Sequence, residues 1–273
     1  MTTHVDRTIA ALRAQHDRLA ELVARSSEET LAARSGAQEW SVADVLSHLG
    51  SGAEIMRMPI LAAIDGTPAP EGGMQPIWDR WNALAPRDQA TQYVEHDARY
   101  VETVEALDAA QRGELLVDLG FLPEPVPLEV ALGMRLDEVA LHAWDVQVAT
   151  DPSAVVDGES AELLLELMGG SMSFLLGFLG KPDQLSVPAR VAVAGHVLEV
   201  AEGVSLTARG ATDGADGADG ADGADEVTAT WSGPMEAFVR LVGGRLGPAH
   251  TPDGVSVTGN VGLDDLRAVF PGF

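Results

Sequence analysis

The sequence predicts an α+β protein, in which an antiparallel four-helix bundle over residues 1–152 is followed by a small α+β domain over residues 153–273. Three observations support this division. Apolar residues recur at helical spacing along four long stretches of the first part, where no segment alternates as a strand does. Apolar and polar residues alternate in several short segments after Asp151-Pro152. The length of 273 residues also corresponds to about two domains at roughly 150 residues per domain.

The first two helices have clear patterns. We expect the first from Val5 to Val23, because apolar residues recur there at helical spacing opposite charged ones. The second is expected from about Val42 to Ile64, since Ser41 followed three residues later by Asp44 is close to a capping box. Trp40 precedes this cap, in the position from which a hydrophobic residue packs on the first turn as a staple. A loop rich in glycine and proline should end the helix.

The third and fourth helices complete the predicted bundle. A helical pattern from about Arg87 to Leu107 predicts the third. The fourth follows a proline-rich break and extends from Leu128 to Ala149. Four long helices without a convincing strand are typical of an antiparallel bundle.

The second domain is expected to begin with a helix from Glu159 to Leu179, in which Gly169-Gly170 is a weak point. Two further helices are expected, one from Ser232-Gly233-Pro234 through Arg240 and one from Leu263 to Phe270. The expected strands are Arg190–Val200, Val204–Ala208, Val227–Trp231 and Gly254–Thr258.

An Asp-Gly-Ala repeat occupies about residues 212–226, between the second and third of these strands. Its low hydrophobicity and high charge favour a solvated, disordered insertion. Calcium binding is the alternative for so many carboxylates, but the repeat lacks the spacing of calcium-binding loops. We therefore assign it no role.

The composition excludes several classes of function. Asp and Glu outnumber Lys and Arg by 42 to 17, which leaves a formal net charge of −25. Such a charge repels phosphate backbones and anionic lipids, so we expect neither nucleic acid nor a membrane as a partner. No stretch resembles a signal peptide or a membrane span, so we expect a cytoplasmic protein. The sequence has no cysteine, which excludes disulfides, thiolate metal ligands and a protein thiol nucleophile.

The candidate site begins with Glu138 and His142 in the fourth helix. They are four residues apart, so their side chains leave the same face of the helix and can share one cation. Arg135 and Asp145 extend the same polar stripe, while apolar residues cover most of the remaining circumference. An ordinary exposed Glu–His pair would explain so short a pattern. A helix that is apolar on most sides is usually buried, however, and a buried polar stripe needs internal partners or a metal.

His48 in the second helix supplies a third ligand. It lies in line with Val45 and Ile55, on a face expected to pack, and alone it would be a core histidine. Beside Glu138 and His142 it completes a set of two histidines and one carboxylate. Three protein ligands leave one coordination position open, which is typical of a catalytic rather than a structural site.

Other polar and aromatic residues receive lesser roles. Asp44 and Asp145 would orient the two imidazoles, although Asp44 is equally explained as the capping partner of Ser41. Trp78 and Trp81 are expected to pack or to anchor a loop rather than to line a substrate entrance. The histidines without a partner at ligand spacing are treated as structural or exposed, namely His4, His16, His96, His196 and His250.

Two motifs together carry a family resemblance. Trp-Ser-Val-x-Asp-Val-x-x-His-Leu at residues 40–49 and Asp-Glu-x-x-x-His-x-Trp-Asp at residues 137–145 resemble the mycothiol-dependent maleylpyruvate isomerase family. The resemblance covers nearly the whole chain, and it implies a DinB-like four-helix bundle followed by a sterol-carrier-like domain. It places the metal ligands on His48, Glu138 and His142, with zinc as the ion. It also implies a catalytic arginine in the second domain, for which Arg245 at the end of a helix is the best candidate, with Arg240 close by.

A zinc ion stabilises a bound thiolate at neutral pH and makes it available as a nucleophile. The resemblance implies mycothiol as that thiol, in the role of a cosubstrate. The chain is then an isomerase or an S-transferase that acts on a small activated substrate. Two other functions stay open: a non-catalytic small-molecule binding protein with a structural metal, and a thiol-independent metal-assisted hydrolase. Thiol-dependent turnover would favour the isomerase or S-transferase. Ligand retention without turnover would favour the binding protein, and thiol-independent activity would favour the hydrolase.

Overall fold

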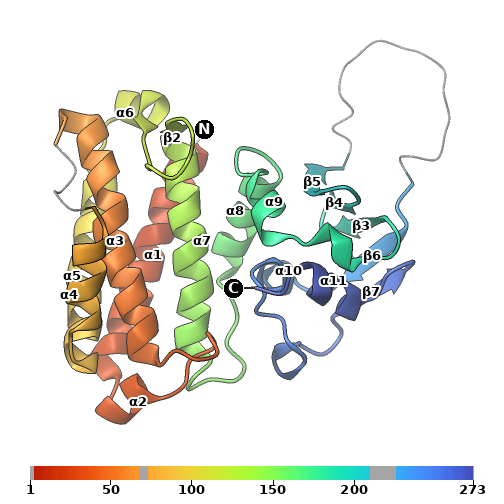
Figure 1. The fold of residues 1–273 in the computed structure, drawn as a ribbon, viewed down its shortest axis with the longest axis horizontal. Coiled ribbons are helices and arrows are strands. Elements are labelled where there is room, and N and C mark those ends of the chain that lie inside the picture. The colour runs from red at the N-terminus through yellow and green to blue at the C-terminus, as the bar shows by residue number, and fades with distance from the viewer. Residues whose placement is uncertain (1–2, 68–72, 210–225, 273) are drawn as a thin grey trace. The chain divides into compact units, whose positions relative to one another are not determined.

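The computed structural model describes residues 3–67, 73–209 and 226–272. The chain divides into two compact units, Met1–Leu163 and Leu164–Phe273, and the division falls inside helix α8, Gly158–Met168 (Figure 1). The Asp-Gly-Ala repeat lies outside the described residues. No helix in the described ranges combines the length and the apolar character that a membrane crossing needs.

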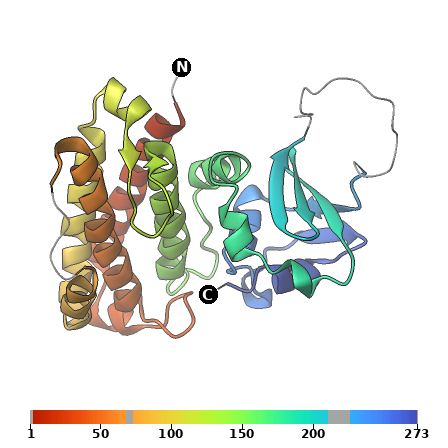
Figure 2. The ribbon, with the colours of Figure 1, turned by 45° about the horizontal axis from the view of Figure 1, so that its top comes forward.

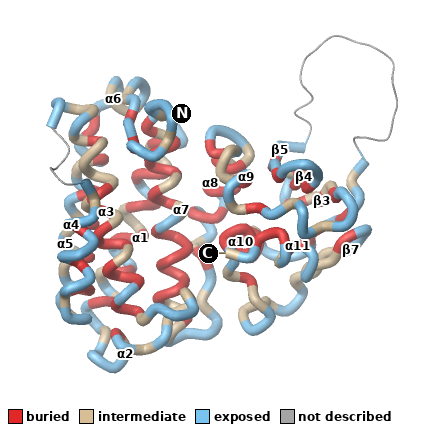
Figure 3. Tube along the Cα trace, viewed as in Figure 1, coloured by how far each residue is buried: buried red, intermediate tan, exposed pale blue. Residues whose placement is uncertain are grey.

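Four long helices make up most of the first unit: α1 (His4–Arg25), α3 (Val42–Asp65), α5 (Pro86–Glu105) and α7 (Leu128–Gln147). Each begins and ends within two residues of an expected helix, so these four predictions are confirmed. Helix α1 packs against α5 and α7, and α3 packs against the same two helices, which closes a bundle (Figure 1, Figure 2). Buried residues, drawn in red in Figure 3, recur along these helices, and most residues of α7 are buried.

Helix α3 begins with the expected capping box. Ser41 Oγ accepts a hydrogen bond from Asp44 N at 3.1 Å, and the Asp44 carboxylate accepts one from Ser41 N at 2.9 Å. The helix ends at Gly66, whose φ of 77° is a left-handed conformation that glycine adopts without strain. The cap fixes where α3 starts, and with it the place of His48 two turns further on.

The described part of the first unit also contains short elements that the sequence patterns do not predict. They are the helices α2 (Glu28–Ala32), α4 (Gln75–Asn82) and α6 (Ala109–Glu114), and the paired strands β1 (Leu116–Val117) and β2 (Val126–Pro127). The expectation that the first part lacks strands is therefore wrong. Strands of two residues are too short to show an alternating pattern.

A mixed five-stranded sheet with the order β5-β4-β3-β6-β7 forms the second unit. Strands β3 and β6 run parallel, and the other neighbours pair antiparallel. The strands are β3 (Ala189–Val193), β4 (His196–Val200), β5 (Val204–Ala208), β6 (Ala229–Ser232) and β7 (Ser256–Gly259). Helices α8, α9 (Leu175–Leu179), α10 (Met235–Val242) and α11 (Leu263–Val269) bury apolar side chains against this sheet. Short 3-10 turns lie at Pro182–Gln184 and Pro248–His250.

Two predictions for the second unit are wrong, and for the same reason. The segment Arg190–Val200, expected as one strand, is the hairpin β3–β4, which turns at Ala194 and Gly195 with φ values of 43° and 82°. The segment Glu159–Leu179, expected as one helix, is divided into α8 and α9 by a turn that begins at Gly169. In both cases the apolar pattern continues across the break, and only glycine marks it.

A buried ion pair joins the helices of the first unit. Arg135 of α7 donates from Nη2 to Asp97 Oδ1 of α5 at 2.7 Å and to the Leu49 carbonyl of α3 at 3.0 Å. The other carboxylate oxygen of Asp97 lies 2.9 Å from His16 Nδ1 of α1. Burial raises the pKa of Asp97, but the hydrogen bond from His16 and the charge and hydrogen bond of Arg135 outweigh it, so the pKa lies below its ordinary value. One charged cluster therefore contacts all four long helices.

Replacing Arg135 with methionine should lower the free energy of unfolding by about 3 kcal/mol, because Asp97 would stay buried without its counter-charge. The double variant Arg135→Met, Asp97→Leu should recover most of this loss, since it buries no charge. Urea denaturation of the metal-free proteins measures both changes. The matched control is Arg13→Met, which removes a partly exposed pair with Glu105 between α1 and α5 and should cost less than about 1 kcal/mol. An Arg135→Met protein as stable as the wild type would contradict the role given to the ion pair.

Candidate metal centre

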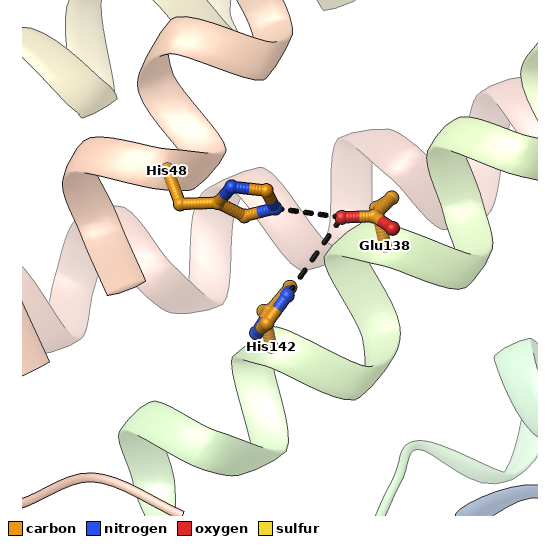
Figure 4. Close-up of side chains that lie close together, drawn as sticks. All are labelled: His48, Glu138 and His142. Carbon is orange, nitrogen blue, oxygen red and sulfur yellow. Dashed lines mark hydrogen bonds and ion pairs between the residues drawn. The ribbon is translucent and has the colours of Figure 1, made fainter. Parts of the chain in front are cut away.

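Two helices bring the three predicted ligands together. His48 projects from α3, and Glu138 and His142 project from neighbouring turns of α7 (Figure 4). His48 Nε2 lies 2.8 Å from Glu138 Oε2, and His142 Nε2 lies 3.7 Å from the same oxygen. One possible ligand atom from each residue lies within 4.8 Å of the other two. The fold therefore brings two imidazole nitrogens and one carboxylate oxygen close together.

The three side chains differ in exposure. His142 is 11% exposed, whereas His48 is 40% and Glu138 is 52% exposed. One side of the cluster is therefore set into the bundle, and the other side is reachable from solvent. A partly open cluster suits a site that keeps a free coordination position, as catalytic zinc sites do.

Asp145 orients the His142 ring. Its Oδ2 lies 2.8 Å from His142 Nδ1, and the Asp145 side chain is fully buried. When Nδ1 carries the ring proton, it donates to this carboxylate, and Nε2 then presents its lone pair to the cluster. The expected contact between Asp145 and His142 is confirmed. Asp44, the other expected orienting residue, instead accepts hydrogen bonds from the backbone and hydroxyl of Ser41 at the helix cap.

The electrostatics of the cluster keep Glu138 ionised. Desolvation by the surrounding atoms raises the pKa of Glu138, but the hydrogen bond from His48 and the charges of His142, His48 and Arg135 lower it to about 2. The carboxylate is therefore anionic at neutral pH. Neutral imidazole nitrogen and carboxylate oxygen are the ligands that zinc takes where no thiolate is present. The donor set thus fits a divalent transition metal ion.

The loop before α3 lies against this cluster, which sequence reasoning did not predict. The Trp40 ring centroid lies 5.2 Å from that of His48 and 6.0 Å from that of His142. The loop is tied to α7 by a hydrogen bond of 2.8 Å from Gly36 N to the Asp145 carbonyl. One feature of the sequence could have indicated this contact, namely that Trp40 directly precedes the cap of the helix that carries His48.

The predicted catalytic arginine, Arg245, lies in the second unit just after α10. Its Nη1 donates to the Gly243 carbonyl at 2.7 Å. Its neighbour Arg240 is buried and donates two hydrogen bonds to the Glu236 carboxylate, at 2.8 and 3.1 Å. Arg240 therefore serves the core of the second unit, and Arg245 stays the predicted catalytic residue.

Histidines expected to be structural have partners away from the cluster. His16 belongs to the buried charged group around Asp97. His96 Nδ1 lies 3.4 Å from the Glu54 carboxylate, which also accepts a hydrogen bond of 3.0 Å from Trp81 Nε1. Trp81 is fully buried, in agreement with the packing role expected for it.

Comparison with known proteins agrees with the fold. Two uncharacterised proteins, from two strains of Mycobacterium tuberculosis, are each 27% identical to this chain over 157 residues, or 58% of this chain and 74% of theirs. A crystal structure of mycothiol-dependent maleylpyruvate isomerase covers 96% of this chain and 98% of its own, with a TM-score of 0.60 and 16% identity. A histidine-to-alanine mutant of that isomerase covers the same shares, with a TM-score of 0.61 and 17% identity. At these identities the likeness shows the fold.

The first unit also matches a family model. Residues 12–147, about half of the chain, match the mycothiol maleylpyruvate isomerase N-terminal domain. This segment contains all three clustered residues and the Arg135–Asp97 ion pair. The chain therefore belongs to the mycothiol maleylpyruvate isomerase N-terminal domain family, and its helical first unit and mixed five-stranded sheet have the fold of the solved isomerase.

Proposed function

We propose that this chain is a metal-dependent enzyme that uses a low-molecular-weight thiol as its cosubstrate. The observation that carries the proposal is the convergence of His48, Glu138 and His142 within 4.8 Å in a chain without cysteine. Any sulfur at the cluster must then belong to a diffusible molecule. The names of the family and of the solved relative identify mycothiol as the thiol of those proteins, and we extend it to this chain.

Zinc is the ion that we propose for the cluster, because two histidines and one carboxylate match its ligand preferences and leave a position open. When bound, the ion lowers the pKa of a coordinated thiol and so stabilises a thiolate nucleophile at neutral pH. The chain contributes the rest. Asp145 keeps His142 Nε2 facing the cluster, and Glu138 supplies a fixed negative charge. The exposed side of Glu138 and His48 gives the thiol an approach from solvent.

The substrate class that we propose is a small molecule with an activated double bond. Addition of the thiolate forms a carbon–sulfur bond, and the electron pair of the carbon–carbon double bond moves onto the activating group, which leaves a carbon–carbon single bond that is free to rotate. Elimination then breaks the carbon–sulfur bond, restores the double bond in the other geometric form and releases the thiol. Where elimination does not follow, the thiol stays on the product and the enzyme is an S-transferase.

Arg245 is the residue that we propose for catalysis from the second unit, since a guanidinium can pair with the carboxylate of an acidic substrate. The engagement of Arg240 with Glu236 supports this choice between two nearby arginines. We also propose that the first unit is a DinB-like antiparallel bundle and that the second is a sterol-carrier-like domain. The helix packing of the first unit and the mixed sheet of the second support these assignments.

Purified protein should contain close to one zinc or other divalent ion per chain. The variants His48→Ala and His142→Ala should each bind the metal at least about tenfold more weakly, because one of three ligands is missing. Elemental analysis after dialysis against a chelator measures the metal content. The matched control is His4→Ala, which removes a histidine that is 43% exposed and 3.4 Å from Glu129, and which should keep the metal. Full metal content in both cluster variants would refute the site.

Mycothiol added to the cobalt-substituted protein should produce a sulfur-to-cobalt charge-transfer absorption, because a thiolate enters the coordination shell. Glu138→Gln should weaken this response, since the variant lacks the anionic donor. Turnover of an activated double bond should require the thiol. Hydrolysis at the same rate with and without thiol would instead support the hydrolase, and tight retention of an apolar ligand without turnover would support the binding protein.

A further inference from the structure

The two histidines of the cluster are oriented by different means. His142 has the arrangement usual for a metal ligand, because its second ring nitrogen is held by the buried carboxylate of Asp145. His48 lacks that partner: among the residues that the structure describes, its recorded hydrogen bond is the one from Nε2 to Glu138, and none involves Nδ1. The nearest carboxylate along α3, Asp44, is engaged at the helix cap. A ligand that is 40% exposed needs some other restraint on its ring.

Trp40 supplies contacts to both rings. Its ring centroid lies 5.2 Å from that of His48 with the planes tilted by 49°, and 6.0 Å from that of His142 with the planes tilted by 20°. The two imidazoles meet edge to face, with centroids 4.8 Å apart. The indole therefore lies beside both imidazoles. These distances fall in the range in which aromatic rings attract one another.

Trp40 is itself held in place on both sides. The backbone carbonyl of Trp40 accepts hydrogen bonds from Ser35 N at 3.0 Å and from Ser35 Oγ at 2.8 Å. The backbone N–H of Trp40 donates to the Ala37 carbonyl at 2.9 Å. The same loop donates from Gly36 N to the Asp145 carbonyl. A Cβ at Gly36 would lie only 2.8 Å from Asp145 Oδ1, so glycine is what allows the loop to approach this closely. The loop therefore contacts Asp145, which holds the His142 ring, and it carries the Trp40 ring, which lies beside His48.

Exposure also sets Trp40 apart from a core residue. Trp40 is 39% exposed, although it is a large apolar residue. A tryptophan used only as a helix staple would be expected to bury its ring against the first turn. The Trp40 ring also contacts the rings of His48 and His142.

We infer that Trp40 is a positioning residue of the cluster, whose indole holds the His48 ring with Nε2 toward Glu138, as Asp145 does for His142. The expected effect on metal affinity rests on the proposed metal centre. The expected orientation of the His48 ring does not rest on it, because the ring has this orientation in the protein without metal. Loss of an orienting partner typically weakens metal binding by about 10-fold to 100-fold, and an aromatic contact belongs at the lower end of that range.

The test is the zinc dissociation constant, measured by competition with a chromophoric chelator. Trp40→Ala and Trp40→Leu should bind zinc about tenfold more weakly than the wild type, because neither keeps a ring face. Trp40→Phe should stay within about threefold, because phenylalanine keeps an aromatic face. The matched control is Trp78→Ala on α4, which should leave the affinity unchanged. Trp78 is 42% exposed, and within the described part of the chain the indole that contacts the two imidazoles is that of Trp40.

Two further measurements separate positioning from simple stability. Urea denaturation of the metal-free variants reports the fold, and Trp40→Leu, which keeps apolar volume, should unfold close to the wild type while still binding zinc weakly. Nuclear Overhauser contacts between the Trp40 and His48 rings should be present in metal-free wild type. Unchanged zinc affinity in Trp40→Leu, or the absence of those contacts, would overturn the inference and leave the proposed function standing. A wild type that binds no metal but shows the ring contacts would refute the metal centre alone.

Discussion

The ion pair between Arg135 and Asp97 is the interaction on which the geometry of the first unit depends. It joins α7 to α5, and through the Leu49 carbonyl and His16 it also reaches α3 and α1. Leu49 directly follows His48 on α3, and Arg135 lies one turn before Glu138 on α7. The hydrogen bond from Arg135 to the Leu49 carbonyl therefore also fixes the spacing between the two helices that carry the clustered residues. Two buried charges lose hydration that apolar residues would not have to lose. What the pair contributes above all is therefore a fixed geometry.

Helix α7 shows how one polar stripe serves two purposes. Arg135 faces the bundle core and is 2% exposed, whereas Glu138 one turn later is 52% exposed. His142 and the fully buried Asp145 turn back toward the interior. The loop before α3 donates a hydrogen bond from Gly36 N to the Asp145 carbonyl at the end of this stripe. The loop that leads into the cap of α3 is therefore bonded to the helix that carries Glu138 and His142. A single helix thereby carries both the buried charge of Arg135 and two of the three residues that are candidates for holding a metal ion.

Residue patterns predicted the parts of this structure that depend on local sequence. The four long helices, the Ser41–Asp44 cap and the shared face of Glu138 and His142 could be found, because helical periodicity places side chains on faces. His48 lies on another helix, and it was joined to that pair by its ligand chemistry and by the family resemblance. The partner of Arg135 could not, since Asp97 and His16 sit on other helices and no spacing rule connects them. The contact of Trp40 with the imidazoles depends on how a loop folds back, which periodicity does not describe. The hairpin at Ala194-Gly195 was missed because alternation continues through the turn.

The charges of the three clustered residues bear on which form of the proposed thiol would reach them. Glu138 is the anionic donor among the three, so a divalent ion held by them would keep about one unit of positive charge for a further ligand. One thiolate would neutralise that charge. The net charge of −25 acts in the opposite direction at longer range, because an acidic surface repels an approaching anion. A neutral thiol that loses its proton only at the cluster avoids this repulsion. For the proposed thiol cosubstrate, the acidic surface and the single anionic residue of the cluster would together favour a molecule that arrives protonated and loses its proton only at the site.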